Sequence, residues 1–183
     1  MFNFSQKKII RLTLSDNESL DYQLIKKSKK TVSLKITEDG LVVSAPLLMV
    51  DNQNLKIFYK NLNDQMKLKK FFIKWLKIVA LDYFSQRAYQ ISKSNSIPKN
   101  SILLTNAKTK WGSCNSKTEV RINWRLIQAD PYVADYVICH EFAHLTYMNH
   151  SKNFWNLVEN LCPDYKLAEN YLKNKGFNLY LID

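Results

Sequence analysis

The sequence predicts an α+β protein in which a small antiparallel β region precedes a long helix and a core of helices and strands. Three observations support this class. Residues 1–50 show the apolar–polar alternation of half-buried strands, residues 68–91 repeat large apolar side chains at threes and fours, and residues 131–175 continue the helical spacing. The 183-residue chain is 46% apolar, so it is long and apolar enough to bury a core.

The N-terminal part is expected to form two hairpins. Four segments carry the strand pattern and are bounded by polar or turn residues: 9–14, 20–25, 31–36 and 41–45. Glu38-Asp39-Gly40, between the last two segments, is a hairpin turn signal. We therefore expect an antiparallel β region over residues 1–50 and a core over residues 51–183, together forming one compact unit.

The middle of the chain changes from strand to helical spacing. Apolar residues within 54–62 suit a short helix, and residues 68–91 predict a long amphipathic helix whose remaining surface is rich in lysine. Two strands are then predicted, at residues 102–105 and 120–124. The segment between them, residues 108–116, is expected to be a loop.

The C-terminal third is expected to contain three helices. Asp130-Pro131 is a typical helix start, with Asp as N-cap and Pro at the first helical position, and the pattern continues to about Met148. Ser151 can cap the second helix. The last helix ends at Gly176, a residue type that is common at helix C-caps.

The net charge of +11 is unevenly distributed. Residues 1–110 hold 20 Lys and Arg against 8 Asp and Glu, a balance of +12, whereas residues 111–183 hold 7 against 8, a balance of −1. A basic N-terminal half can attract nucleotides, nucleic acid or an acidic partner. A solvated, lysine-rich surface with no specific partner is the alternative.

The composition also bears on location. The cysteines, Cys114, Cys139 and Cys162, are an odd and sparse set, which suggests reduced thiols in a cytosol rather than a disulfide scaffold. No apolar secretory segment is visible at the start, and the apolar run at residues 71–84 is too short and too charged to span a bilayer. We expect a soluble, cytoplasmic protein without a membrane partner, and the sequence leaves its oligomeric state open.

The histidines give the strongest functional signal. All three lie within the eleven residues from His140 to His150, and His140 and His144 form an H-E-x-x-H motif. Side chains four apart on a helix share a face, so both imidazoles can bind one Zn²⁺. Glu141 points to a neighbouring angle, where it can hold a water without binding the metal. This arrangement is typical of zinc hydrolases.

A catalytic zinc site needs a third protein ligand and an open fourth position. His150 stands six residues after His144, where the chain can fold back to the metal if Asn149 turns it in a left-handed conformation. Alternatively, His150 lies beside the metal and supports a ligand without binding the metal itself. Asp135 and Asp164 are candidates to orient a ligand imidazole, and a surface or helix-capping role is the alternative for either.

With these residues named, the chain resembles the YgjP-like metallopeptidase family, which is related to the WLM and SprT-like zincins. The resemblance covers roughly residues 108–175. The matching motifs are Trp111-Gly112-Ser113-Cys114, Ile122-Asn123-Trp124-Arg125-Leu126, Asp135-Tyr136-Val137, His140-Glu141-x-Ala143-His144-Leu145, Met148-Asn149-His150-Ser151, Phe154-Trp155 and Cys162-Pro163-Asp164-Tyr165. The N-terminal half matches only in kind, and a β segment around residues 50–65 looks reduced or missing.

The resemblance implies a zincin-like fold with zinc ligands at His140, His144 and His150 and with Glu141 as the catalytic residue. In the expected mechanism, zinc lowers the pKa of a bound water and Glu141 takes its proton as general base. In zincins an edge strand beside the active helix holds the peptide, and Trp111-Gly112-Ser113 is the candidate for that contact here. Core packing is the alternative for the tryptophan.

Three functions remain open. A zinc metallopeptidase acting on peptides or proteins is the first. A zinc-dependent nucleotide pyrophosphatase is the second, because one family member has been assigned that activity on UTP and the basic N-terminal half could contact phosphates. A zinc-stabilised nucleic-acid or protein-binding module is the third, although a structural zinc site has no need of Glu141.

Overall fold

The structure is a computed structural model. It describes residues 9–15, 18–26, 33–37, 40–44, 53–58, 65–98 and 100–181. The α+β prediction is confirmed, since the described chain contains four α-helices and two sheets. The chain divides into two compact units, Met1–Lys74 and Trp75–Asp183, which are described separately. The predicted boundary at residue 50 stays a prediction.

The first unit contains an antiparallel five-stranded sheet with the strand order β1-β2-β5-β4-β3. Its strands are β1 (Ile9–Ser15), β2 (Glu18–Lys26), β3 (Ser33–Thr37), β4 (Gly40–Ser44) and β5 (Gln53–Phe58). The β1–β2 and β3–β4 pairs are the two predicted hairpins. The predicted antiparallel β region is therefore present.

Strand β5 corrects two expectations: the short helix at residues 54–62 and the missing β segment in the same region. Leu55 and Ile57 alternate with Asn54 and Lys56, so the segment fits a strand as well as a helix. Strand β5 pairs with β2 on one side and β4 on the other. Two neighbouring strands offer this short segment backbone partners on both sides, and tertiary context of this kind overrides weak local spacing.

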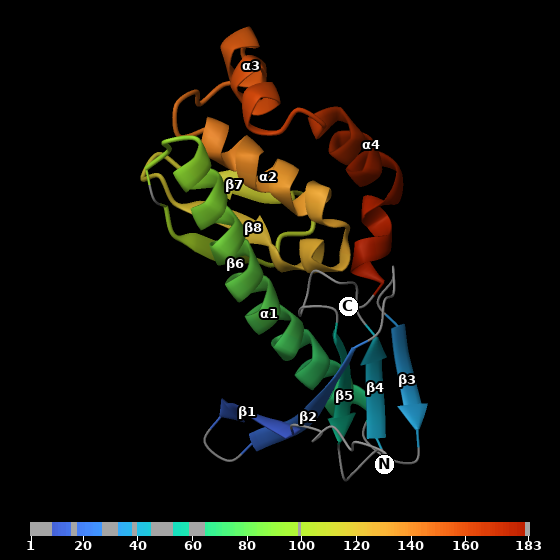
Figure 1. The fold of residues 1–183 in the computed structure, drawn as a ribbon. Coiled ribbons are helices and arrows are strands. Elements are labelled where there is room, and N and C mark those ends of the chain that lie inside the picture. The colour runs from blue at the N-terminus through green and yellow to red at the C-terminus, as the bar shows by residue number, and fades with distance from the viewer. Residues whose placement is uncertain are drawn as a thin grey trace, which may run out of the picture. The chain divides into compact units, whose positions relative to one another are not determined.

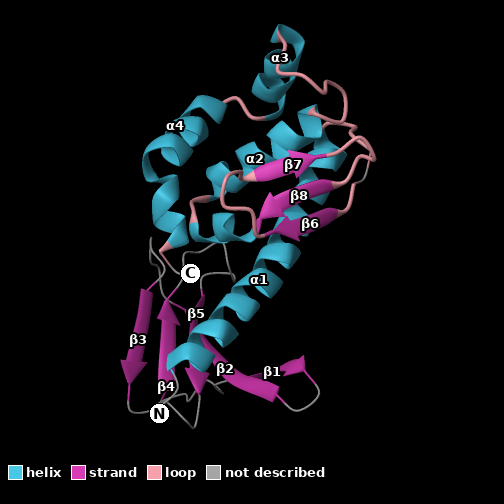
Figure 2. Cartoon of the chain, turned by 180° about the vertical axis from the view of Figure 1, so that it is seen from behind, coloured by secondary structure: helices cyan, strands magenta, loops and turns pink. Residues whose placement is uncertain are grey.

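The second unit contains a three-stranded sheet with the order β6-β8-β7. The strands are β6 (Ile102–Thr105), β7 (Gly112–Cys114) and β8 (Val120–Asn123). Strand β8 runs parallel to β6 and antiparallel to β7, which forms one edge. Strand β7 lies inside the segment predicted to be a loop. The helix α2 (Pro131–Ala143) crosses one face of this sheet, in front of it in Figure 1 and behind it in Figure 2.

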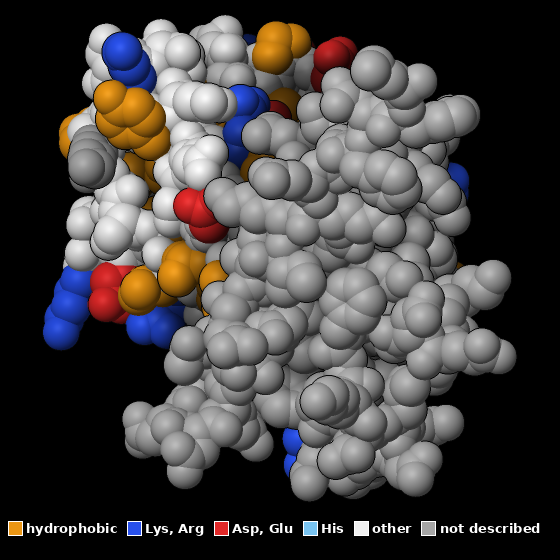
Figure 3. All heavy atoms as spheres, turned by 60° about the horizontal axis from the view of Figure 1, so that its bottom comes forward, with side chains coloured by type: hydrophobic (Ala, Val, Ile, Leu, Met, Phe, Trp, Pro, Cys, Tyr) orange, Lys and Arg blue, Asp and Glu red, His pale blue; other side chains and the backbone are white. Residues whose placement is uncertain are grey.

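The long helix α1 (Gln65–Ser94) confirms the predicted amphipathic helix. Within the second unit its buried residues recur at threes and fours, as the sequence predicts. They are Trp75, Leu76, Ala80, Phe84, Ala88 and Ile91. The exposed Lys and Arg side chains coloured in Figure 3 are scattered among acidic, hydrophobic and uncharged ones. No described helix combines the length and apolar character needed to cross a membrane.

The C-terminal helices begin where the sequence predicts, but the first ends early. α2 starts at Pro131 and stops at Ala143 instead of continuing to Met148. After Ala143, the N–H groups of Leu145 and Thr146 donate to carbonyls three residues back, which tightens the chain and ends the helix. The following elements are α3 (Lys152–Leu161), α4 (Tyr165–Lys175) and the 3-10 helices η1 (Trp124–Gln128) and η2 (Gly176–Tyr180).

Gly176 occupies the predicted C-cap of α4, but for a different physical reason. Its φ of −58° is right-handed, so no left-handed conformation requires glycine there. A Cβ at this position would instead lie 2.8 Å from Cζ2 of Trp111. Gly176 therefore gives Trp111 the space to pack against the end of α4.

Asp135 links two helices rather than orienting a histidine. Its carboxylate accepts from Nε of Arg87 at 2.8 Å and from Nη2 at 2.7 Å, a bidentate pair between α1 and α2. Asp164 lies at the N-cap position of α4, and no hydrogen bond joins it to a histidine in the described part of the chain. The sequence hypothesis that either aspartate orients a ligand is wrong for Asp135.

The Arg87–Asp135 pair gives the first prediction. Asp135→Asn should lower the free energy of unfolding by roughly 1–2 kcal/mol, because it weakens a partly buried, charge-assisted contact. Bound metal should be retained in full. Urea unfolding and metal analysis measure the two effects, with Asp82→Asn, an exposed residue on α1, as the control. Loss of metal at unchanged stability would restore Asp135 as a residue that supports the histidines.

Candidate metal centre

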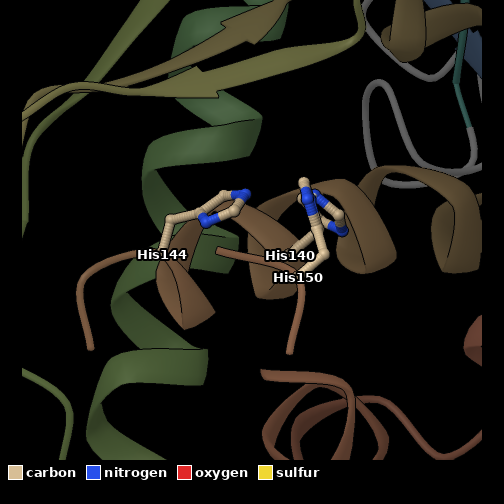
Figure 4. Close-up of side chains that lie close together, drawn as sticks. All are labelled: His140, His144 and His150. Carbon is tan, nitrogen blue, oxygen red and sulfur yellow. The ribbon is translucent and has the colours of Figure 1, made fainter. Parts of the chain in front are cut away.

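The structure brings the three histidines together. His140 lies on α2, His144 is its C-cap residue, and His150 lies in the segment before α3. Their ring nitrogens lie within 4.8 Å of one another. Figure 4 shows the rings of His140 and His150 beside each other, with the ring of His144 facing them. The sequence-predicted triad is therefore a cluster in space.

The closest approach joins Nε2 of His140 and Nε2 of His150, at 3.1 Å. Two nitrogens that bind one tetrahedral zinc at 2.0–2.1 Å lie about 3.3–3.4 Å apart. The observed distance is close to that value. The other separations within the triad are at most 4.8 Å, so the cluster could hold one metal ion.

A backbone carbonyl fixes the tautomer of His144. Nδ1 of His144 lies 3.0 Å from the carbonyl oxygen of Tyr147, and a carbonyl only accepts, so Nδ1 carries the proton. Nε2 is then left with a free lone pair. Ligand histidines commonly make such a second hydrogen bond, which holds the ring in its binding orientation.

Burial keeps His140 neutral. Its pKa is lowered to about 4, first by burial and then by the neighbouring His144 and His150. The pKa of His144 is also lowered, mainly by burial. Nδ1 of His140 is buried and has no hydrogen-bond partner among the described residues. An unmade hydrogen bond of this kind costs about 1–3 kcal/mol, which metal binding at Nε2 can offset.

Phe154 lies beneath all three rings. Its ring centroid lies 4.9 Å from that of His140, 4.5 Å from that of His144 and 4.7 Å from that of His150. Phe154 is fully buried at the start of α3, where its backbone N–H donates to the side chain of the N-cap Ser151. Trp155 stacks on His150 at 5.9 Å. Sequence analysis matched this pair to the family without giving it a role at the histidines.

The turn that brings His150 back does not use a left-handed Asn149. Among the described non-glycine residues, positive φ values occur at Ser96 and Thr118. The expectation for Asn149 is therefore wrong. The reversal follows instead from the early end of α2 and from the aromatic packing of His150 on α3.

Glu141 is 5% exposed and lines the same pocket as His140. Burial raises the pKa of its carboxyl group to about 7, and the nearby Lys110 opposes the shift. Gly112 allows the β7 backbone to approach this carboxyl group, because a Cβ there would lie 2.7 Å from Cγ and 2.8 Å from Cδ of Glu141. The glutamate is thus confined between α2 and β7.

Strand β7 presents backbone groups at an open edge. The N–H of Asn123 donates to Trp111 and the N–H of Asn115 donates to Glu119, so residues 111, 113 and 115 pair towards β8. The backbone groups of Gly112 and Cys114 consequently point away from β8. The side chains alternate as well: Cys114, two residues after Gly112, interacts electrostatically with Glu141. The side chain of Ser113 therefore lies on the opposite face of β7.

Asn123 holds the segment that leads into β7. Its side chain is fully buried and donates to the carbonyls of Ala107 at 2.7 Å and Lys110 at 3.2 Å. Trp124 is also buried, and its indole N–H donates to Asn106 at 2.6 Å. Core packing is thus the role of Trp124. In the strand pattern Asn123 alternates with Ile122 and Trp124, which predicts a surface position, so its anchoring role has no signal in the hydrophobic spacing.

A pocket of about 380 Å³ opens beside His140 and Glu141. One wall is formed by Lys110, Trp111 and Gly112, and α2 contributes Tyr136 and Val137. The opposite wall comes from α4, through Glu169, Leu172 and Lys173. The predicted substrate residues Trp111 and Gly112 therefore lie at the site, whereas Ser113 is not part of the pocket lining. Sequence analysis did not identify the α4 wall.

The histidine cluster gives the second prediction. His140→Ala, His144→Ala and His150→Ala should each lower metal affinity by more than the roughly 10–100-fold typical of residues that only support a ligand. Native mass spectrometry and competition with a chelator measure the loss, and Asn149→Ala is the matched control. Undiminished affinity in His150→Ala, with a normal circular dichroism spectrum, would show that two histidines suffice.

Comparison with known families agrees with this geometry. The model of the YgjP-like family, a metallopeptidase domain, matches residues 6–175. This match extends the resemblance from residues 108–175 to nearly the whole chain, including the first sheet. Searches of curated proteins and of solved structures gave no match. The chain therefore belongs to the YgjP-like metallopeptidase domain family.

Proposed function

We propose that the protein is a zinc-dependent peptidase in which His140, His144 and His150 bind the metal and Glu141 is the general base. The observation that carries the proposal is the convergence of three imidazoles, one of which, His140, lines the same pocket as the buried Glu141 and Gly112 of the edge strand. Membership of a metallopeptidase family supports a peptide or protein substrate.

The donor set favours zinc. Three imidazole nitrogens suit borderline metals such as Zn²⁺, whereas Mg²⁺ and Ca²⁺ prefer oxygen ligands. Structural zinc sites are usually closed by four protein ligands. Among the described residues, the histidines form a cluster of three, so a fourth position is left for water or substrate. This argues against the zinc-stabilised binding module.

When bound, zinc would lower the pKa of water and polarise the scissile carbonyl. In the proposed mechanism, Glu141 takes the proton of the attacking water and passes it to the leaving amine. In the metal-free protein, burial raises the pKa of this carboxyl group to about 7, which brings its proton exchange close to neutral pH. Because Gly112 has no Cβ, the side chain of Glu141 can lie directly against the backbone of β7.

Strand β7 is the proposed support for the substrate backbone. The outward N–H and C=O groups of Gly112 and Cys114 can pair with an extended peptide as an added strand. The pairing would run along the edge next to Glu141. Gly112 thus contributes backbone groups to the edge, and Trp111 and Gly112 both line the pocket. Ser113 is not part of the pocket lining.

A nucleotide pyrophosphatase is the second candidate. Lys110 and Lys173 line the pocket and could contact phosphate oxygens. Casein, peptides and nucleoside triphosphates, each assayed with and without a chelator, separate the two candidates. Chelator-sensitive release of pyrophosphate or phosphate without any peptide cleavage would favour the nucleotide hydrolase.

The role of Glu141 gives the third prediction. Glu141→Gln should lower kcat by roughly 10²–10⁴-fold, because the amide cannot take a proton from water. Its zinc content should match the parent protein, since Glu141 is not proposed as a ligand. Single-turnover assays and metal analysis provide the measurement. Cleavage at the parent rate would remove Glu141 from the mechanism.

The close approach of Gly112 gives the fourth prediction. Gly112→Ala should lower kcat/KM by about 100-fold, since the new methyl group displaces the carboxyl group from its working position. Zinc binding should persist because no ligand is touched. Ser113→Ala, on the opposite face of β7, is the matched control and should retain activity. Equal losses in both variants would point to a general disturbance of the strand.

A further inference from the structure

We propose that the pocket between α2 and α4 selects an acidic side chain next to the scissile bond, with Lys173 as a specificity-determining residue. The inference rests on the proposed peptidase function and extends it to the class of substrate. It depends on where the pocket opens, on the charged residues of its lining and on its apolar lining residues.

The pocket opens at the reacting centre. His140 and Glu141 belong to its lining, so it starts where the metal and the general base would meet the scissile bond. A volume of about 380 Å³ lies at the lower end of the roughly 300–1,000 Å³ typical of ligand pockets. It is therefore large enough to hold a side chain of a bound peptide.

The charges of the walls favour an anion. Lys110 and Lys173 face the pocket from two separate segments, the loop before β7 and helix α4. Neither lysine forms an ion pair with any residue in the described part of the chain. Among the described residues that line the pocket, Glu141 and Glu169 are acidic, and Glu169 lies four residues before Lys173 on the same helix. A substrate carboxylate can accept from both ammonium groups, and Glu169 is the charge on α4 that opposes this preference.

The remaining lining fits the stem of such a side chain. Val137 and Leu172 supply apolar surface on opposite sides, and Tyr136 supplies an aromatic ring. The methylene groups of a glutamate can lie against this surface while its carboxylate reaches the lysines. Hydrophobic side chains would use the same surface but would leave both ammonium groups without an anion.

Lys173 is the position to test. It is exposed on α4 and is not proposed as a ligand or as the general base, whereas Lys110 interacts with Glu141 and its replacement would also alter the general base. Lys175 is a matched control, because it lies in the same last turn of α4 but outside the pocket lining. Lys173→Glu and Lys175→Glu make the same charge change near the same helix end.

The experiment uses the zinc-loaded full chain and a peptide mixture, whose cut sites are mapped by mass spectrometry. Asp or Glu should be enriched at one position next to the cut. Matched peptides with Glu, Gln or Lys at that position then give kcat/KM ratios. Lys173→Glu should lower the Glu-over-Gln preference and raise cleavage of the Lys peptide, each by about fivefold or more. Lys175→Glu should change neither.

Binding gives a readout that is independent of turnover. In a Glu141→Gln background, the Glu peptide should bind more tightly than the Gln peptide, and Lys173→Glu should remove the difference. Glu169→Gln should strengthen the acidic preference, because it removes the opposing charge. Peptide cleavage without an acidic preference, or equal shifts in Lys173→Glu and Lys175→Glu, would overturn the subsite while leaving the peptidase intact. Complete absence of peptide cleavage would overturn both.

Discussion

The candidate metal centre depends on the chain reversing direction between Ala143 and Ser151. His140 and His144 share one face of α2 by spacing alone, but the third imidazole arrives only because the helix ends at Ala143. A helix continued by one more turn would carry the chain away from the first two rings. Phe154, packed under all three rings, holds the returning segment against α2. Helix termination and one buried phenyl ring therefore determine whether the triad forms.

A second constraint acts at the carboxyl group. Glu141 is buried between a helix and an edge strand, and the strand can come this close because Gly112 has no side chain. Gly176 likewise lacks a side chain where one would clash, and it leaves space for Trp111 at the pocket wall. Two of the three glycines in the chain thus serve close packing around one cavity. Both sites are crowded by side chains, so even a methyl group would disturb them.

Local patterns predicted much of this arrangement. The hairpins, the long helix, the starts of the C-terminal helices and the clustering of the histidines all follow from spacing and capping residues. The spacing at residues 54–62 predicts a helix where strand β5 lies, because so short an apolar pattern fits both periods and only the neighbouring strands decide between them. The pocket wall on α4 had no local signal, since Glu169, Leu172 and Lys173 look like an ordinary helix surface. Asn123 was hidden by strand alternation, although it anchors the loop before β7.

The short open edge of β7 has a consequence for which proteins are exposed to cleavage. A chain can pair with Gly112 and Cys114 only if several of its residues are extended and have unsatisfied backbone groups of their own. Segments inside helices or sheets do not meet this condition until they unfold locally. An enzyme that recognises its substrates through such an edge would leave intact domains alone and act on loose loops, chain ends and damaged or incompletely folded polypeptides.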